Sequence, residues 1–96
     1  MHFTKLDKIE VGQEVELVTQ LELEESPLKN ARVRYEIWSE KNADKKDWVT
    51  AEESSPGEYR IAHRFAEADT FTVVIHVEDD EDLHEHEEHI IDVNLE

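Results

Sequence analysis

Residues Glu14–Glu24 read EVELVTQLELE, a stretch in which apolar and polar side chains alternate almost without a break. One face of this stretch carries Val15, Leu17, Thr19, Leu21 and Leu23. Successive side chains of a β-strand point to opposite faces of its sheet, so a period of two separates a core face from a solvent face. The stretch therefore predicts a half-buried β-strand.

The same alternation recurs along the rest of the chain. Four further strands are expected over Ala31–Glu40, Gly57–Phe65, Thr70–Glu78 and Glu85–Asn94. Lys5–Val11 and Asp47–Ala51 are weaker candidates, and the competing helical stretch Ala43–Glu53 lacks a sustained apolar stripe. Seven short strands at this spacing predict an all-β fold, an immunoglobulin-like antiparallel β-sandwich of about seven strands.

Turn-forming residues separate the expected strands. Ser54-Ser55-Pro56-Gly57 is the sharpest of these signals, because proline presets φ and glycine tolerates a positive φ. Asp79–Asp82 reads as an acidic hairpin loop. We also expect Trp38 and Trp48 to pack in the core or between the sheets.

Composition bounds the size and the partners of the protein. The 96 residues include 26 acidic and 10 basic side chains, a net charge of −16. Val, Ile, Leu and Phe make up about a quarter of the chain, above the roughly 20% at which a charged chain stays disordered. We expect one domain over residues 4–94, with Leu95-Glu96 typical of a cloning remnant.

Several classes of function are disfavoured by the same numbers. A charge of −16 repels phosphate, so nucleic acid is not an expected partner. The chain has no apolar run that could insert into a membrane and no cysteine to form a disulfide, thiolate site or nucleophile. Neither a serine triad nor a desolvated carboxylate pair is evident, so we do not expect an enzyme.

Histidines gather near the end of the chain. The segment Glu78–His89 reads EDDEDLHEHEEH, and His76 lies just before it. These four histidines outnumber the two others in the sequence, His2 and His63. We expect His63 to be partly buried and hydrogen-bonded, because it shares the parity of neighbouring apolar residues.

A hairpin around the acidic loop would bring three histidines to one face. We expect Val77 opposite Leu83 and His76 opposite His84, with His86 two residues further along. Directly opposed β-carbons lie about 4.5–5.5 Å apart, which is within reach of one ion. A register shift of one residue would separate the three side chains.

Imidazole is a good ligand for copper and zinc, and nearby carboxylates can complete the coordination shell. The sequence thus predicts a divalent metal site formed by His76, His84 and His86. His89 has the parity of Ile91 and Val93, so its side chain is expected to face inward.

Two other interpretations of the segment stay open. The histidines and acids could form a solvated edge strand, on which charge discourages pairing with another chain. The loop from Glu78 to Asp82 offers carboxylates for Ca²⁺, although it lacks the spaced ligands and the glycine of an EF-hand.

Short motifs spread over Gly12–Asn94 resemble the YtkA-like domain, a small bacterial β-sandwich related to FixH-type proteins. The motifs, in order, are Asn30-Ala31-x-Val33-x-x-x-Ile37, Pro56-Gly57-x-Tyr59, Phe65, Phe71-x-Val73-x-x-His76-Val77, His84-x-His86 and Val93. The sequence departs from the family at Asp69-Thr70, where members usually have a glycine.

The resemblance implies a domain outside the cytoplasmic membrane, tethered or lipid-anchored through a leader upstream of Met1. It also implies a link to copper handling for the three histidines that match, His76, His84 and His86. We therefore expect an extracytoplasmic accessory module that binds Cu or Zn and meets an envelope protein partner. The alternative is a structural or protein-interaction module without metal.

Overall fold

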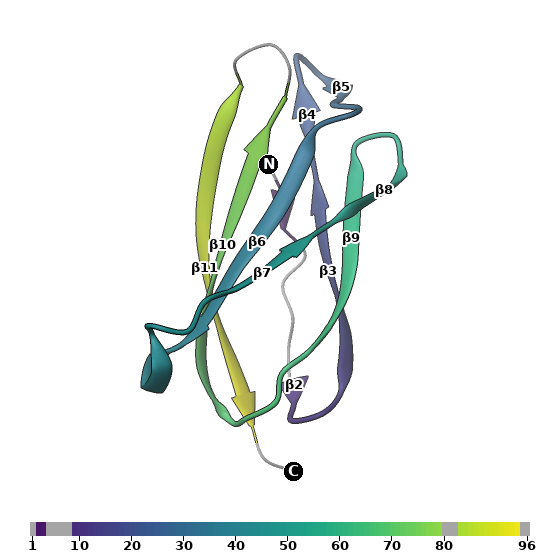
Figure 1. The fold of residues 1–96 in the computed structure, drawn as a ribbon. Coiled ribbons are helices and arrows are strands. Elements are labelled where there is room, and N and C mark those ends of the chain that lie inside the picture. Colours follow the sequence, from purple (N-terminus) through teal and green to yellow (C-terminus); the bar gives the residue numbers. More distant parts are fainter. Residues whose placement is uncertain (1, 4–8, 80–82, 95–96) are drawn as a thin grey trace.

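The computed structural model describes residues 2–3, 9–79 and 83–94, and nearly all of their regular structure is β-strand (Figure 1). The strands are β1 (His2–Phe3), β2 (Ile9–Glu10), β3 (Glu14–Gln20), β4 (Glu22–Leu23), β5 (Ser26–Pro27), β6 (Arg32–Ser39), β7 (Asp47–Thr50), β8 (Glu52–Ser55), β9 (Glu58–Arg64), β10 (Asp69–Glu78) and β11 (His84–Asn94). One 3₁₀-helix, η1 (Glu40–Asn42), follows β6. No helix in the described part of the chain is long and apolar enough to span a membrane.

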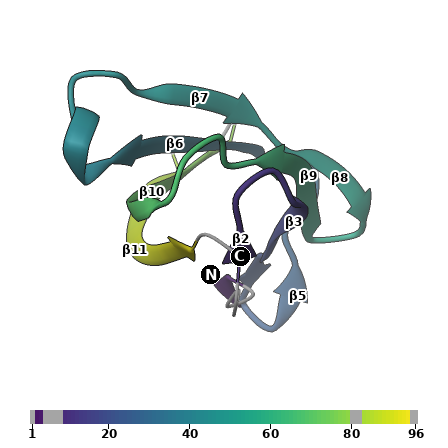
Figure 2. The same ribbon diagram turned by 90° about the horizontal axis from the view of Figure 1, so that it is seen from below.

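Two main sheets form the layers of a sandwich, as the view from below shows (Figure 2). The four-stranded sheet has the order β1-β3-β9-β8, and the five-stranded sheet has the order β2-β11-β10-β6-β7. The chain passes between these two sheets several times, for example directly from β7 to β8, and β4 pairs with β5 in a separate two-stranded sheet. Neighbouring strands are antiparallel except for β2 and β11, which are parallel. The predicted all-β sandwich is confirmed, while its immunoglobulin-like type stays a prediction.

The strands predicted from alternation are present, with small shifts at their ends. The structure adds β1, β5 and β8, which the alternation did not indicate. Ile9–Glu10 of the expected first strand forms β2, and residues 4–8 of it lie outside the described residues. The predicted single strand over Glu14–Glu24 is divided, because β4 leaves the sheet of β3 and turns to pair with β5.

The core lies between the two sheets and consists of the inward side chains of their long strands. The largest completely buried residues include Tyr35, Tyr59, Phe65, Leu17, Ile37 and Ile75. The Tyr35 hydroxyl is hydrogen-bonded to Thr19 Oγ1 at 2.7 Å and so joins the two layers. Burial raises the pKa of Tyr35 to about 12, although the hydrogen bond with Thr19 lowers it.

A second buried tyrosine fixes the connection that leads into β6. The Tyr59 hydroxyl donates to the carbonyl of Leu28 at 2.7 Å and accepts from the amide of Ala31 at 3.0 Å. These bonds satisfy two backbone groups that would otherwise lack partners at the edge of the core, where each unmade bond costs about 1–3 kcal/mol. The side chain therefore holds residues 28–31 against β9.

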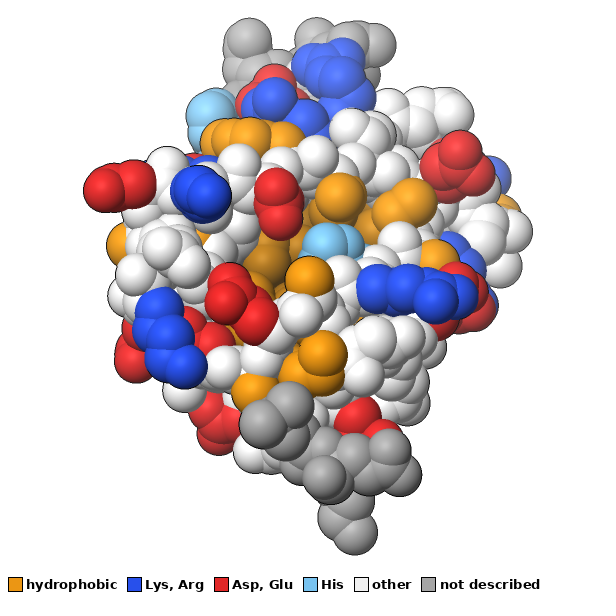
Figure 3. All heavy atoms as spheres, turned by 60° about the horizontal axis from the view of Figure 1, so that its bottom comes forward, with side chains coloured by type: hydrophobic (Ala, Val, Ile, Leu, Met, Phe, Trp, Pro, Cys, Tyr) orange, Lys and Arg blue, Asp and Glu red, His pale blue; other side chains and the backbone are white. Residues whose placement is uncertain are grey.

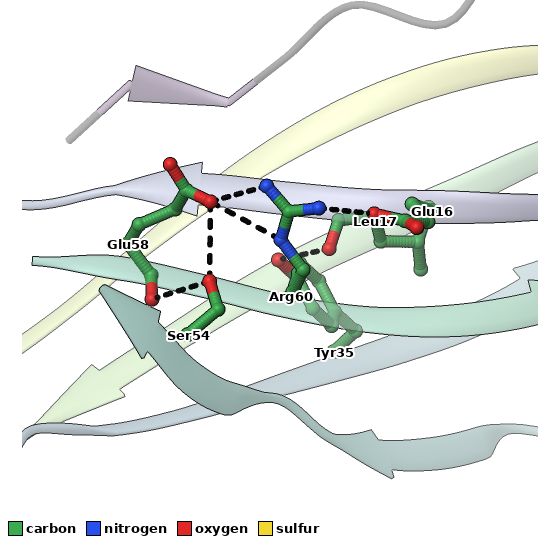
Figure 4. A network of polar contacts seen from close by, with 6 residues as sticks. All are labelled: Glu16, Leu17, Tyr35, Ser54, Glu58 and Arg60. Atoms are coloured by element: carbon green, nitrogen blue, oxygen red, sulfur yellow. Dashed lines mark hydrogen bonds and ion pairs between the residues drawn. The ribbon is translucent and has the colours of Figure 1, made fainter.

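Paired charges cover the outer face of the four-stranded sheet. Arg60 on β9 contacts Glu58 and lies 2.6 Å from Glu16 on β3, while Ser54 on β8 donates to the Glu58 carboxylate (Figure 4). Four residues further along β9, Arg64 lies 3.2 Å from Glu14 of β3. Exposed pairs of this kind contribute only about 0.2–1 kcal/mol each. They keep this face polar and mixed in sign.

The turn at Pro56-Gly57 has the predicted geometry. Gly57 has a φ of 78°, and its carbonyl accepts a hydrogen bond from the amide of Leu21 at 2.7 Å. A β-carbon at this position would lie 2.8 Å from the Leu21 carbonyl oxygen and 2.8 Å from the Pro27 β-carbon. Positive φ and close packing therefore both require glycine here.

The hairpin of β10 and β11 has a different register from the predicted one. His76 lies opposite His86 and Val77 lies opposite Glu85, so the predicted pairs His76–His84 and Val77–Leu83 are wrong. Leu83 belongs to the connection, because its amide donates to the Asp79 carboxylate at 3.0 Å and its carbonyl accepts from the Asp79 amide at 3.3 Å. Residues 80–82 of the expected acidic loop lie outside the described residues.

His63 is half-buried on β9, and its ring packs edge-on against Phe65 at 4.7 Å between ring centres. Partial burial is as expected, and the contact found is aromatic. Burial lowers the pKa of His63, while the charge of Asp47 acts in the opposite direction.

Figure 3 shows the end that is lower in Figure 1, where hydrophobic side chains and a histidine gather between charged ones.

Two glycine variants test the turn. Gly57→Ala and Gly12→Ala both place a side chain at positive φ, which costs about 1–2 kcal/mol. Only the alanine at 57 also meets other atoms, since nothing lies within 4 Å of a β-carbon at Gly12. We expect Gly57→Ala to lose about 1–3 kcal/mol more stability in urea unfolding. Equal losses in the two variants would contradict the packing part of this account.

His63 predicts a pH dependence of stability. Its folded pKa lies below its unfolded value, so the unfolded chain takes up the proton first as the pH falls below about 6.5. The folded protein therefore loses part of its stability as the pH falls from about 6.5 toward the lower folded pKa of His63. We expect His63→Gln to flatten the fall in melting temperature between about pH 7.5 and 5.5. The exposed His84→Gln serves as the control, and an equal flattening in both would show that His63 is not responsible.

Candidate metal centre

The predicted histidines lie on the outer face of the five-stranded sheet. His76 comes from β10, and His84 and His86 come from β11, the strands at the left of Figure 1. The observed register differs from the predicted one by two residues. Each histidine therefore has a different partner across the hairpin but lies on the predicted face of the sheet. All three side chains therefore share one face, as predicted.

The structure brings two of the three histidines together. His76 and His86 are direct cross-strand partners, and their ring centres lie 6.3 Å apart with planes tilted by 32°. His84 instead lies opposite Glu78, nearer the hairpin loop. A nitrogen–zinc distance of about 2.0–2.1 Å places ring centres about 5–6 Å apart when two imidazoles share an ion. The 6.3 Å between the ring centres of His76 and His86 is close to that separation.

Neighbouring side chains hold His76 in place. Its Nε2 atom lies 3.0 Å from the Glu36 carboxylate, and Glu36 also lies 3.4 Å from Lys46 Nζ. The side chains of His76 and Glu36 are only 20% and 13% exposed. A carboxylate on one ring nitrogen orients a histidine and leaves the other nitrogen for a metal. Glu36 therefore presents Nδ1 of His76 as the nitrogen that remains to bind an ion.

Trp48 lies on this face rather than in the core. Its side chain is 50% exposed, and its ring lies 5.0 Å from that of His76 and 5.2 Å from the Arg34 guanidinium carbon. The expectation of core or inter-sheet packing is therefore wrong. Where β7 pairs with β6, Trp48 lies opposite Glu36, which is an outward position. Trp38 shares this parity on β6, where Lys46 covers its ring at 4.8 Å.

We call the outer surface around these residues the histidine face. It is defined by Glu36, Trp48, Val74, His76, His86 and Ile90. Within the described ranges, no group of three or more His, Cys, Asp or Glu side chains is already arranged around one point. The ligand set of His76, His84 and His86 thus stays a prediction, with the pair His76–His86 as its structural centre.

His89 lies on the opposite, inner side of β11, as its parity predicts. Its ring packs 4.8 Å from Phe3 of β1. Nε2 lies 2.7 Å from the Glu87 carboxylate, in a direction that does not make a hydrogen bond. The side chain is 31% exposed. His89 therefore belongs to the contact between the sheets and not to the histidine face.

Comparisons with known proteins agree with this architecture. No curated protein matches the sequence. A crystal structure of a candidate glycoside hydrolase from Bacteroides vulgatus matches with a TM-score of 0.60 and 17% identity, over 93% of this chain and 17% of that one. The chain thus spans a small part of that protein, and at this identity the likeness shows the fold alone.

The sequence also matches a known family. The profile of the family described as YtkA-like matches residues 1–76, which is most of the chain and includes His76. The matched region ends before β11, so it does not extend to His84 and His86. On the strength of this match, the chain belongs to the YtkA-like family.

Proposed function

We propose that this YtkA-like domain is an extracytoplasmic, non-catalytic accessory module that binds a divalent metal ion, Cu²⁺ or Zn²⁺. The observation that carries the proposal is the cross-strand pair of His76 and His86, whose ring centres lie 6.3 Å apart. His84 follows on the same face and is the candidate for a third ligand. The location outside the membrane is what the family resemblance implies.

The available ligands favour a divalent ion over Cu⁺. Soft thiolate and thioether ligands select Cu⁺, but the chain has no cysteine and its one methionine is Met1. Imidazole nitrogens with carboxylates nearby suit Cu²⁺ and Zn²⁺. The charge of −16 raises the local concentration of cations around the whole domain.

Glu36 supports the proposal from behind the first ligand. Its hydrogen bond with His76 fixes the orientation of the ring and leaves the other ring nitrogen available to an ion. The ion would lie on the open surface of a sheet, where a partner protein can reach it. Such a site suits transfer or presentation of a metal, and the partner would be another envelope protein.

Calorimetric titration of the tag-free protein with Zn²⁺ and Cu²⁺ tests this function. We expect His76→Ala and His86→Ala each to weaken binding at least tenfold, because each removes a ligand nitrogen. Glu36→Gln should weaken it by about 10–100-fold through the orientation of His76. Binding should also weaken as the pH falls from about 7.5 to about 5.5, since protons compete for imidazole.

A control variant and two contrary outcomes make the test decisive. His63 lies on the other sheet, so the His63→Gln variant should bind metal like the parent protein. Unchanged affinity after replacement of all three histidines would point to carboxylates near the hairpin loop and favour Ca²⁺. No binding at micromolar concentrations would favour the interaction module without metal.

A further inference from the structure

We propose that the metal ion is shared by two copies of this chain, which meet through their histidine faces. The inference rests on the proposed metal binding and adds to it the partner that completes the site. Three observations on the same face lead to it: an incomplete set of ligands, exposed apolar side chains and a nearly balanced local charge.

One chain offers too few ligands in a suitable arrangement. Closed zinc sites take four ligands in a tetrahedron. The described residues bring together the pair His76 and His86, and no group of three potential ligands surrounds one point among them. A two-fold axis near this pair would set His76 and His86 of each copy around one ion, giving four imidazoles. An isologous contact of this kind places the same patch of both copies together.

Exposed apolar residues lie on the same face as this pair: Trp48 packs against His76, and Ile90 follows His86 four residues further along β11. In the described part of the chain the large hydrophobic side chains that remain exposed are Trp48 at 50% and Ile90 at 60%. Both point outward from the five-stranded sheet, and Val74 between their strands is only 7% exposed. The outer face of the other sheet instead carries ion pairs such as Arg60–Glu16. A second copy would cover the apolar side chains that this face leaves in water.

Local charge permits two copies to meet here despite a net charge of −16 each. Among the described side chains on this outer surface, basic groups of β6 and of the residue before β7 partly offset acidic groups of β2, β6, β10 and β11. The basic residues are Arg32, Arg34 and Lys46, and the acidic residues are Glu10, Glu36, Glu78, Glu88 and Asp92. Arg34 lies 3.0 Å from Glu78, and Lys46 lies 3.4 Å from Glu36. The excess negative charge therefore lies mainly elsewhere on the molecule.

The remaining repulsion makes the association depend on metal. Two copies carry −32 together before an ion is bound, as twice the −16 of one chain. Such self-repulsion keeps acidic proteins monomeric. An ion with four ligands from two copies adds positive charge at the contact and ties both chains to it. We therefore expect a monomer without metal and a dimer with it.

Light scattering after size exclusion, with Zn²⁺ as the probe, tests the inference on tag-free protein. The expected mass is 11.3 kDa in chelator and twice that value with Zn²⁺. Parallel calorimetry should give one Zn²⁺ per two chains. Ile90→Asp should leave the fold intact, because Ile90 is exposed, but keep the protein monomeric in Zn²⁺. Ala62→Asp adds the same charge to the exposed outer side of β9 and should dimerise like the parent.

Each contrary outcome has a separate meaning. Zinc bound by a monomer at one ion per chain would overturn the shared site and leave the proposed function standing. Absence of binding to both Zn²⁺ and Cu²⁺ would overturn the shared site and the proposed function together. A dimer that forms in chelator, or one that survives His86→Ala, would show that copies meet without a bridging ion. A dimer that survives Ile90→Asp would show that the contact lies on another surface.

Discussion

The packing of β10 between its two neighbours is the constraint on which the rest of the structure depends. Its inward side chains Val73, Ile75 and Val77 are at most 1% exposed, and both β6 and β11 pair along its length. A strand fixed so firmly on its inner face has no freedom on its outer face. His76, between Ile75 and Val77, must therefore point outward. The position of the candidate metal ligand is thus a by-product of core packing.

Alternation made the faces of the main strands predictable from sequence, and turn chemistry did the same for Gly57. The hairpin register was not predictable in this way, because a shift of two residues leaves every side chain on the same face and so leaves the alternation unchanged. β8 also escaped detection, since Glu52–Ser55 has no buried side chain and so no hydrophobic pattern. The misplacement of Trp48 has a similar cause. Trp48 was expected in the core because tryptophan is usually buried. Its position in the alternation of β7 instead places it on the outer face.

In the candidate site, too, some features follow from the pattern within one strand, and others depend on residues that are distant in the sequence. Parity alone placed His76, His84 and His86 on one face. The residues that surround His76 come from β6 and from the segment around β7, far away in sequence, and no local pattern indicates them. Glu36, Lys46 and Trp48 become neighbours of His76 only through the order of strands in the sheet. Sequence reasoning therefore placed the candidate ligands on one face but did not indicate the groups that surround His76.

The strand order also bears on how the chain reaches this structure. β10 forms ladders with β6, which lies more than thirty residues earlier, and with β11, which is the final strand of the domain. Folds dominated by such distant pairings close large loops before they gain contacts, and they fold over milliseconds to seconds. On the ribosome, β6 waits for β10, and the other edge of β10 waits for β11. The domain is therefore expected to complete its fold only after synthesis has passed Asn94, with acidic side chains keeping the unfinished sheets in solution.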